Sequence, residues 1–211
     1  MSMENLNKFD IYWIGGSPCS GKSTVVDLLR EKYGFDDFRC DSYMYAHMGK
    51  ADPDNQPIMS KLSRMSWDEI WMRPVELLIE EELAFYHEEF PMLLEEIERN
   101  KDGKPLLVEG NALLPDLLEA AGIDHQRIIY LIPSRDFQVS HYAKRAWKEE
   151  ILKDCVSPEQ AIQNWMDRDA GFGEKVFGRA VELDIRAIRV HAGLPLEEVA
   201  KTVENHFGLS L

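Results

Sequence analysis

Short apolar runs alternate with longer amphipathic segments along the chain. The short runs predict strands over residues 9–14, 37–40, 105–108, 127–132 and 185–190. Helical spacing of apolar residues predicts helices between them, from Lys22 to a stop at Gly34, over 66–99, 113–121 and 134–153, from 157, and over 196–207. Because parallel strands need crossover connections, this alternation predicts an α/β fold with a mostly parallel sheet.

The longest helical region covers residues 66–99. Ser66 followed by Glu69 forms a capping box at its start. An unbroken helix of this length would extend about 50 Å, which is longer than a domain of this size. Pro74 and Pro91 are therefore expected to break or kink it.

Length and charge limit the classes of partner. The 211 residues suit a single domain, 1–211, with room for an inserted lid. Lys and Arg number 24 against 38 Asp and Glu, so the formal net charge is −14. Nucleic acid and anionic membrane surfaces are therefore poor partners, and a small anionic ligand needs a local positive pocket.

Cysteine usage indicates a reducing compartment. Cys19, Cys40 and Cys155 are too few and too scattered for a disulfide framework or a metal knuckle. Residues 1–10 lack the basic-then-apolar pattern of a signal peptide. We expect a cytoplasmic protein, either a monomer or a homodimer.

A phosphate-binding loop lies between the first strand and the first helix. Glycines let backbone N–H groups approach phosphate oxygens, and the helix N-terminus adds partial positive charge. Lys22 can reach the β- and γ-phosphates, and Ser23 can ligate Mg²⁺. The loop fits G-x-x-x-x-G-K-[ST] and predicts binding of ATP with Mg²⁺ by Gly16, Ser17, Pro18, Cys19, Ser20, Gly21, Lys22, Ser23 and the following Thr24.

Other classes of P-loop protein fit the chain less well. Residues 7–10 match the base-reading motif N-K-x-D of GTPases, but they precede the loop instead of following it. A D-x-x-G switch near the third strand is missing from the sequence, as are the further motifs of transport and ring-forming ATPases. We interpret the N-K-x-D match as a coincidence.

The chain resembles the small P-loop kinases, the group that contains adenylate, shikimate, gluconate and cytidylate kinases. The resemblance covers Phe9 to Phe207. It rests on the phosphate loop, on Asp41 after strand two, on Glu109-Gly110 after strand three, and on arginines after strand four.

The resemblance implies a specific architecture. It is a three-layer α/β sandwich with a central five-stranded parallel sheet in the order 2-3-1-4-5. An acceptor-binding helical region would occupy about residues 42–100, and a lid about residues 146–168.

Asp41 and Glu109 follow the second and third predicted strands. Ligands of open α/β sheets bind at the carboxyl ends of the strands, so both acids are expected beside a bound ligand. The resemblance implies that Asp41 binds the acceptor and either orients its hydroxyl or accepts its proton. A turn role for Asp41 is the alternative. Glu109 occupies the position of a Walker B acid, which can hold a Mg²⁺-bound water or the reacting hydroxyl. A plain ion pair is the alternative for Glu109.

The basic candidates flank the expected lid. Family lids bring arginines onto the transferring phosphoryl group, so Arg145 and Arg168 are predicted catalytic residues. Surface charge is the alternative, and Lys144, Arg135 and Arg179 compete for the role.

The acceptor region supplies two further candidates. Arg73 lies in a tryptophan-rich segment and is suited to grip an anionic or planar acceptor. Tyr43, beside a methionine-rich stretch, is predicted to line the same pocket, although gap-filling in a core is equally consistent with such methionines.

The sequence therefore predicts an ATP-dependent kinase that moves a γ-phosphoryl group to a hydroxyl or phosphate of a small molecule. An ATP-binding regulatory module without transfer activity is the alternative, and a structural protein with a vestigial loop is the third. The residues leave the identity of the acceptor open.

Overall fold

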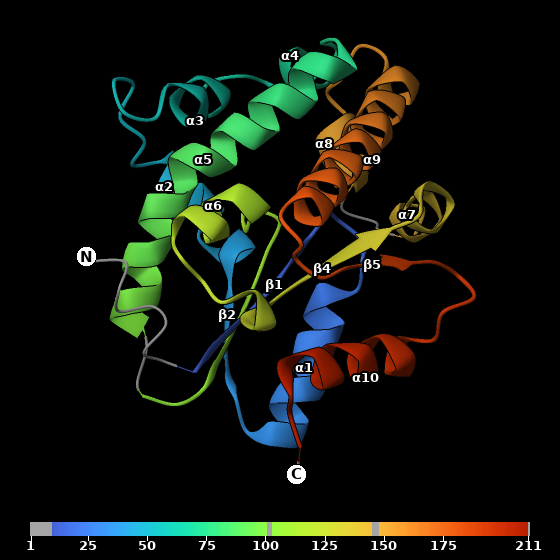
Figure 1. The fold of residues 1–211 in the computed structure, drawn as a ribbon. Helices are drawn as coiled ribbons and strands as arrows, with labels where there is room; N and C mark the ends of the chain where they lie inside the picture. Colours follow the sequence, from blue (N-terminus) through green and yellow to red (C-terminus); the bar gives the residue numbers. More distant parts are fainter. Residues whose placement is uncertain (1–9, 101–102, 145–147, 211) are drawn as a thin grey trace.

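A single parallel sheet forms the centre of the molecule. The computed structural model describes residues 10–100, 103–144 and 148–210. Within these ranges the sheet has the order β2-β3-β1-β4-β5, and every neighbouring pair is parallel (Figure 1). This confirms the predicted fold class and strand order. The strands are β1 (Ile11–Gly16), β2 (Asp36–Arg39), β3 (Leu106–Glu109), β4 (Ile128–Pro133) and β5 (Ala187–Val190).

Helices connect successive strands. None of those in the described part of the chain is long and apolar enough to cross a membrane. Within the described residues, the 3₁₀ turns η2 (Cys40–Ser42) and η3 (His125–Arg127) accompany them. The helices are α1 (Lys22–Tyr33), α2 (Met44–Met48), α3 (Pro57–Leu62), α4 (Trp67–Trp71), α5 (Val75–Asn100), α6 (Pro115–Ala120), α7 (Arg135–Tyr142), α8 (Lys148–Leu152), α9 (Pro158–Glu182) and α10 (Leu196–Phe207).

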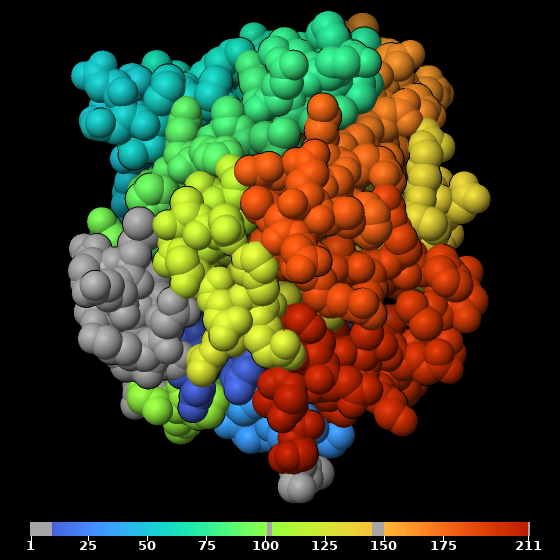
Figure 2. All heavy atoms as spheres, viewed as in Figure 1, coloured from blue at the N-terminus to red at the C-terminus, as the bar shows by residue number. Residues whose placement is uncertain are grey.

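The sheet is covered on both faces, as the predicted three-layer sandwich requires. Successive side chains of a strand point to opposite faces. On β4, Ile129 and Leu131 pack with α1 and α10, whereas Tyr130 and Ile132 pack with α5, α6 and α9. Figure 2 shows α5, α6 and α9 as one continuous surface on the side viewed. Both faces of the sheet are therefore buried in hydrophobic cores.

The two prolines of the long helical region act differently. Pro74 separates α4 from α5, as predicted. Pro91 lies inside α5, which continues to Asn100, so this proline does not break the helix. A proline within a helix costs about 3 kcal/mol. The buried Phe90 and Leu93 on either side of it hold α5 against the core and offset that cost.

The expected helix over residues 134–153 is instead two helices. The first, α7, ends at Tyr142, and α8 begins at Lys148. Arg145 lies between them and outside the described residues.

The helix expected from residue 157 continues through its glycines as α9. A Cβ atom on Gly171 would lie 2.3 Å from Cδ1 of Ile79, and one on Gly173 would lie 2.9 Å from Oγ of Ser17. These glycines therefore let α9 pack closely against α5 and the phosphate loop.

Two leucines of α5 test the importance of this packing. Leu93 is fully buried and Leu77 is 36% exposed. Leu93→Ala should lower the free energy of unfolding by about 2–5 kcal/mol, because it removes buried contacts and leaves a cavity. Leu77→Ala, the matched control, should change it by less than about 0.5 kcal/mol. Urea denaturation measures both, and equal losses would contradict the described orientation of α5.

Candidate active site

The phosphate loop is shaped by two glycines with positive φ. Gly16 has a φ of 147° and Gly21 a φ of 84°. A Cβ atom on Gly16 would lie only 2.0 Å from the carbonyl oxygen of Leu131 on the neighbouring strand. The loop therefore requires glycine at this position, and it leads directly into the N-terminus of α1 at Lys22.

Lys22 directs its ammonium group back over the loop. Its Nζ donates hydrogen bonds to the carbonyl oxygen of Ser17 and to Oδ1 of Asn111, each at 2.9 Å. The residue is only 7% exposed. Sequence reasoning missed Asn111, although its place directly after Glu109-Gly110 at the same sheet edge was an available signal.

The two predicted metal ligands lie together. Oγ of Ser23 donates a hydrogen bond of 2.8 Å to Oε1 of Glu109. Burial raises the pKa of Glu109, while nearby Lys22 and the hydrogen bond from Ser23 act in the opposite direction. Gly110, directly after Glu109, lets the chain pass close to Cys40, since a Cβ atom there would lie 2.5 Å from Cβ of Cys40.

The Ser23–Glu109 pair suits only an ion that takes most of its ligands from phosphate oxygens and water. Among the described residues, no group of three or more His, Cys, Asp or Glu side chains could hold a metal. Mg²⁺ commonly uses one or two protein oxygens and completes its shell with phosphate oxygens and water. The Ser23–Glu109 pair beside a phosphate loop fits that requirement.

A cavity of about 890 Å³ joins the phosphate loop to the helical region. Residues 18–24 line one part of it, together with Asp41, Glu109 and Asn111. The remaining wall comes from the segments between β2 and β3 and from α7, α8 and α9. Its aromatic and methionine side chains are Met44, Tyr45, Met48, Met65, Trp67, Trp71, Phe85, Tyr86, Tyr142 and Trp165.

Arg168 lines this cavity from α9. Its Nη1 lies 2.8 Å from Oε2 of Glu82 and its Nε 2.6 Å from Oδ1 of Asp169. The guanidinium also lies over the Trp71 ring, 5.0 Å from its centre. Burial raises the pKa of Glu82 to about 8 despite the neighbouring Arg168. Glu82 and Asp169 therefore hold Arg168 from two sides. The hydroxyl of Tyr142 donates a hydrogen bond to Asp169.

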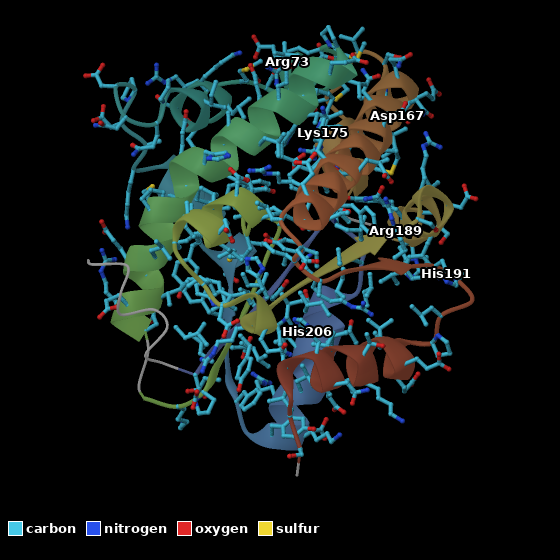
Figure 3. All side chains as sticks on the ribbon, viewed as in Figure 1. Arg73, Asp167, Lys175, Arg189, His191 and His206 are labelled. Carbon is cyan, nitrogen blue, oxygen red and sulfur yellow. The ribbon has the colours of Figure 1, made fainter. Side chains whose placement is uncertain are left out.

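Arg73 lines the cavity where α4 meets α5 (Figure 3). It forms an ion pair with Glu81, and its Nε donates to the carbonyl oxygen of Ile70 at 3.2 Å. Glu81 also pairs with Lys61, at 2.5 Å. Arg73 is therefore near the predicted acceptor region but is already bound to a carboxylate.

Tyr43 lies outside the cavity lining. Its ring stacks on Phe38, with 4.6 Å between ring centres, and its hydroxyl accepts a hydrogen bond from Asn100. The neighbouring residues Met44 and Tyr45 line the cavity instead.

The segments around the expected lid contact the phosphate loop directly. Nε2 of Gln138, a buried residue of α7, donates to the carbonyl oxygen of Pro18 at 3.1 Å. Cys19 packs in one apolar cluster with Trp71, Tyr142 and Trp165. Sequence reasoning missed Gln138, because nothing local relates α7 to a loop so far away in the chain.

A buried pair links α2 to α5. Nδ1 of His47 lies 3.0 Å from Oε1 of Glu89, and both side chains are almost fully buried. Burial lowers the pKa of His47, and burial with the nearby Asp41 charge raises the pKa of Glu89 to about 8. Burial therefore favours the neutral forms of both groups, joined by a hydrogen bond.

Comparison with solved structures identifies the fold. No protein-family model and no curated protein matches the sequence. The structure is similar to that of TT1252 from Thermus thermophilus, with a TM-score of 0.51, 18% identity and coverage of 96% of this chain and 99% of that one. It is also similar to deoxyadenosine kinase from M. mycoides with bound dATP. That match has a TM-score of 0.50 and 15% identity, and it covers 94% of this chain and 99% of that one.

A gluconokinase from Sinorhizobium meliloti 1021 matches with a TM-score of 0.46 and 16% identity, over 96% of this chain and 93% of that one. At 18% and 15% identity, the likeness to the first two structures establishes the fold and not the activity. The chain has the fold of the small P-loop kinases, as the resemblance of its motifs implied.

The raised pKa of Glu89 predicts how the free energy of unfolding depends on pH. The pKa of Glu89 is about 8 in the folded protein, against an ordinary value of 4.5. Between these values the folded state binds more protons than the unfolded state, so the free energy of unfolding falls as pH rises through the window. Glu89→Gln should remove part of that fall, on the order of 1 kcal/mol.

Urea denaturation at the two ends of this window measures the effect. Glu80→Gln, an exposed change on the same helix, is the control and should keep the wild-type pH dependence. An unchanged pH dependence in Glu89→Gln would show that Glu89 is ionised in the folded protein at neutral pH.

Proposed function

We propose that the protein is an ATP-dependent phosphotransferase that moves the γ-phosphoryl group of ATP to a small-molecule acceptor. One observation supports this above all others. Lys22, Ser23 and Glu109 at the phosphate loop line the same cavity as Asp41 and the aromatic helical wall. A single cavity therefore offers adjacent places for a triphosphate and for an acceptor.

The phosphate side would be held by the loop amides and by Lys22. The amides of residues 16–24 and the N-terminus of α1 favour negative charge. Ser23 and Glu109, 2.8 Å apart, would hold Mg²⁺. When bound, that ion would supply positive charge that offsets the charge of the phosphates.

The acceptor side would use Asp41. Glu109 accepts a hydrogen bond from Ser23. Among the described residues, the other two acids of the cavity, Glu81 and Glu82, pair with arginines, so Asp41 is the candidate acid for the acceptor. The acceptor hydroxyl oxygen forms a bond to the γ-phosphorus, the bond from that phosphorus to the ADP oxygen breaks, and the hydroxyl proton passes to Asp41. If the acceptor is a phosphate, its oxygen attacks in the same way.

The lid residues would complete the site. We propose that Arg168 faces the transferring phosphoryl group and offsets its developing charge, with Arg145 as the second candidate. Closure of the segment 146–168 would exclude water, which otherwise would hydrolyse ATP.

We also propose that the protein works in the reducing cytoplasm. Cys19, Cys40 and Cys155 are buried thiols, which supports a reducing cytoplasm. A monomer or a homodimer remains the predicted assembly.

Lys22→Ala tests the proposed transfer. Loss of the ammonium group that faces the phosphates should lower acceptor-dependent ADP formation by about a hundredfold or more. Lys201→Ala, an exposed change on α10, is the control and should leave the rate unchanged. Phosphorylated product is measured by mass spectrometry across a panel of metabolites. Equal turnover by wild type and Lys22→Ala would refute the proposal, and tight ATP binding without any product would favour a regulatory module.

Asp41→Asn tests the acceptor side separately. Removal of the carboxylate should reduce kcat by about a hundredfold or more, because the hydroxyl loses its proton acceptor. The affinity for ATP should stay close to that of the wild type. Asp54→Asn, an exposed change outside the cavity, is the control. An unchanged kcat in Asp41→Asn would assign Asp41 to the turn alone.

A further inference from the structure

The arginines that the described residues contribute to the acceptor half of the cavity lie against carboxylates. Resting on the proposed function, we propose that the phosphoryl acceptor is a hydroxyl compound with an aromatic or apolar body and no phosphate or carboxylate group. The ion pair Arg73–Glu81 is inferred to be the specificity determinant that disfavours anionic acceptors, whereas Arg168 serves the transferring phosphoryl group as proposed above.

Arg73 and Arg168, the two arginines among the described residues that line the cavity, are both paired within the protein. Arg73 pairs with Glu81, which Lys61 also contacts. Arg168 pairs with Glu82 and with Asp169. Oδ1 of the buried Asp169 lies 2.6 Å from Nε of Arg168, so Arg168 has a second carboxyl partner besides Glu82.

An anionic acceptor is also disfavoured by the other charges that line the cavity. In the described part of the chain its charged side chains include the cations Lys22, Arg73 and Arg168 and the acids Asp41, Glu81, Glu82 and Glu109. Lys22 lies over the phosphate loop. An anionic acceptor would therefore meet carboxylates and arginines that already have partners, so it would lose hydration without gaining a partner charge.

The rest of the wall favours an apolar body. Phe85, Tyr86 and Trp71 are largely buried and line the cavity together with Met44 and Met48. Aromatic rings supply a large contact area for planar groups, and methionines adapt to irregular shapes. A volume of about 890 Å³ is within the usual range for small-molecule sites.

Two fluorescent dyes with one body test this directly. Phenylnaphthylamine is uncharged, and anilinonaphthalene sulfonate adds a sulfonate to the same rings. With the phosphate loop blocked by a non-hydrolysable ATP analogue and Mg²⁺, the uncharged dye should bind the wild type at least about tenfold more tightly. Equal or tighter binding of the sulfonate would overturn the exclusion of anions, and failure of both dyes to bind would overturn the apolar body.

Glu81→Gln locates the effect. The substitution removes the carboxylate from Arg73 and should bring the two affinities several-fold closer together. Glu80→Gln makes the same chemical change on the exposed face of α5 and should keep the wild-type ratio. A ratio that changes equally in both variants would place dye discrimination outside the cavity and would overturn the proposal.

The dyes report binding and not catalysis, so this result is separate from the test of phosphoryl transfer. A kinase assay then compares uncharged hydroxyl compounds with their phosphorylated or carboxylated counterparts. Turnover confined to the anionic members would overturn the inference while leaving the phosphotransferase proposal intact.

Discussion

The structure depends on how tightly the phosphate loop is held at the end of the sheet. Gly16 lies so close to the carbonyl oxygen of Leu131 that no side chain fits there. The loop can then turn directly into α1 and aim its amides at one point. The buried ammonium of Lys22 needs partners, and it finds them in Ser17 and Asn111. The carboxyl ends of β1 and β3 are thus tied into one site.

The helical half of the molecule is coupled to this loop by packing and by charge. Gly173 brings α9 against Ser17, and Gln138 of α7 holds Pro18. The pair formed by Glu82 and Arg168 joins α5 to α9 across the wall of the cavity. Any movement of α9 that admits a ligand must therefore change contacts at the loop as well. Binding of an acceptor and of phosphates at the loop would in this way affect one another.

Local patterns were sufficient to predict the strands, the phosphate loop and Ser66 as a helix cap, and the resemblance supplied the strand order. Partners distant in the chain were not predictable. Asn111 and Lys22 are 89 residues apart, and Gln138 and Pro18 are 120 apart. The continuation of α5 through Pro91 depends on burial, which local propensity does not encode. Arg73 lines the cavity, but its pairing with Glu81 could not be predicted from the local sequence.

The most direct measurement is a crystal structure with a non-hydrolysable ATP analogue and Mg²⁺. We expect the terminal phosphates within about 3 Å of Nζ of Lys22 and of the amides of residues 19–24. The metal should contact the Ser23 hydroxyl, with Glu109 bound directly or through a water. A nucleotide seated elsewhere, or a loop closed against the phosphates at saturating nucleotide, would contradict the central claim.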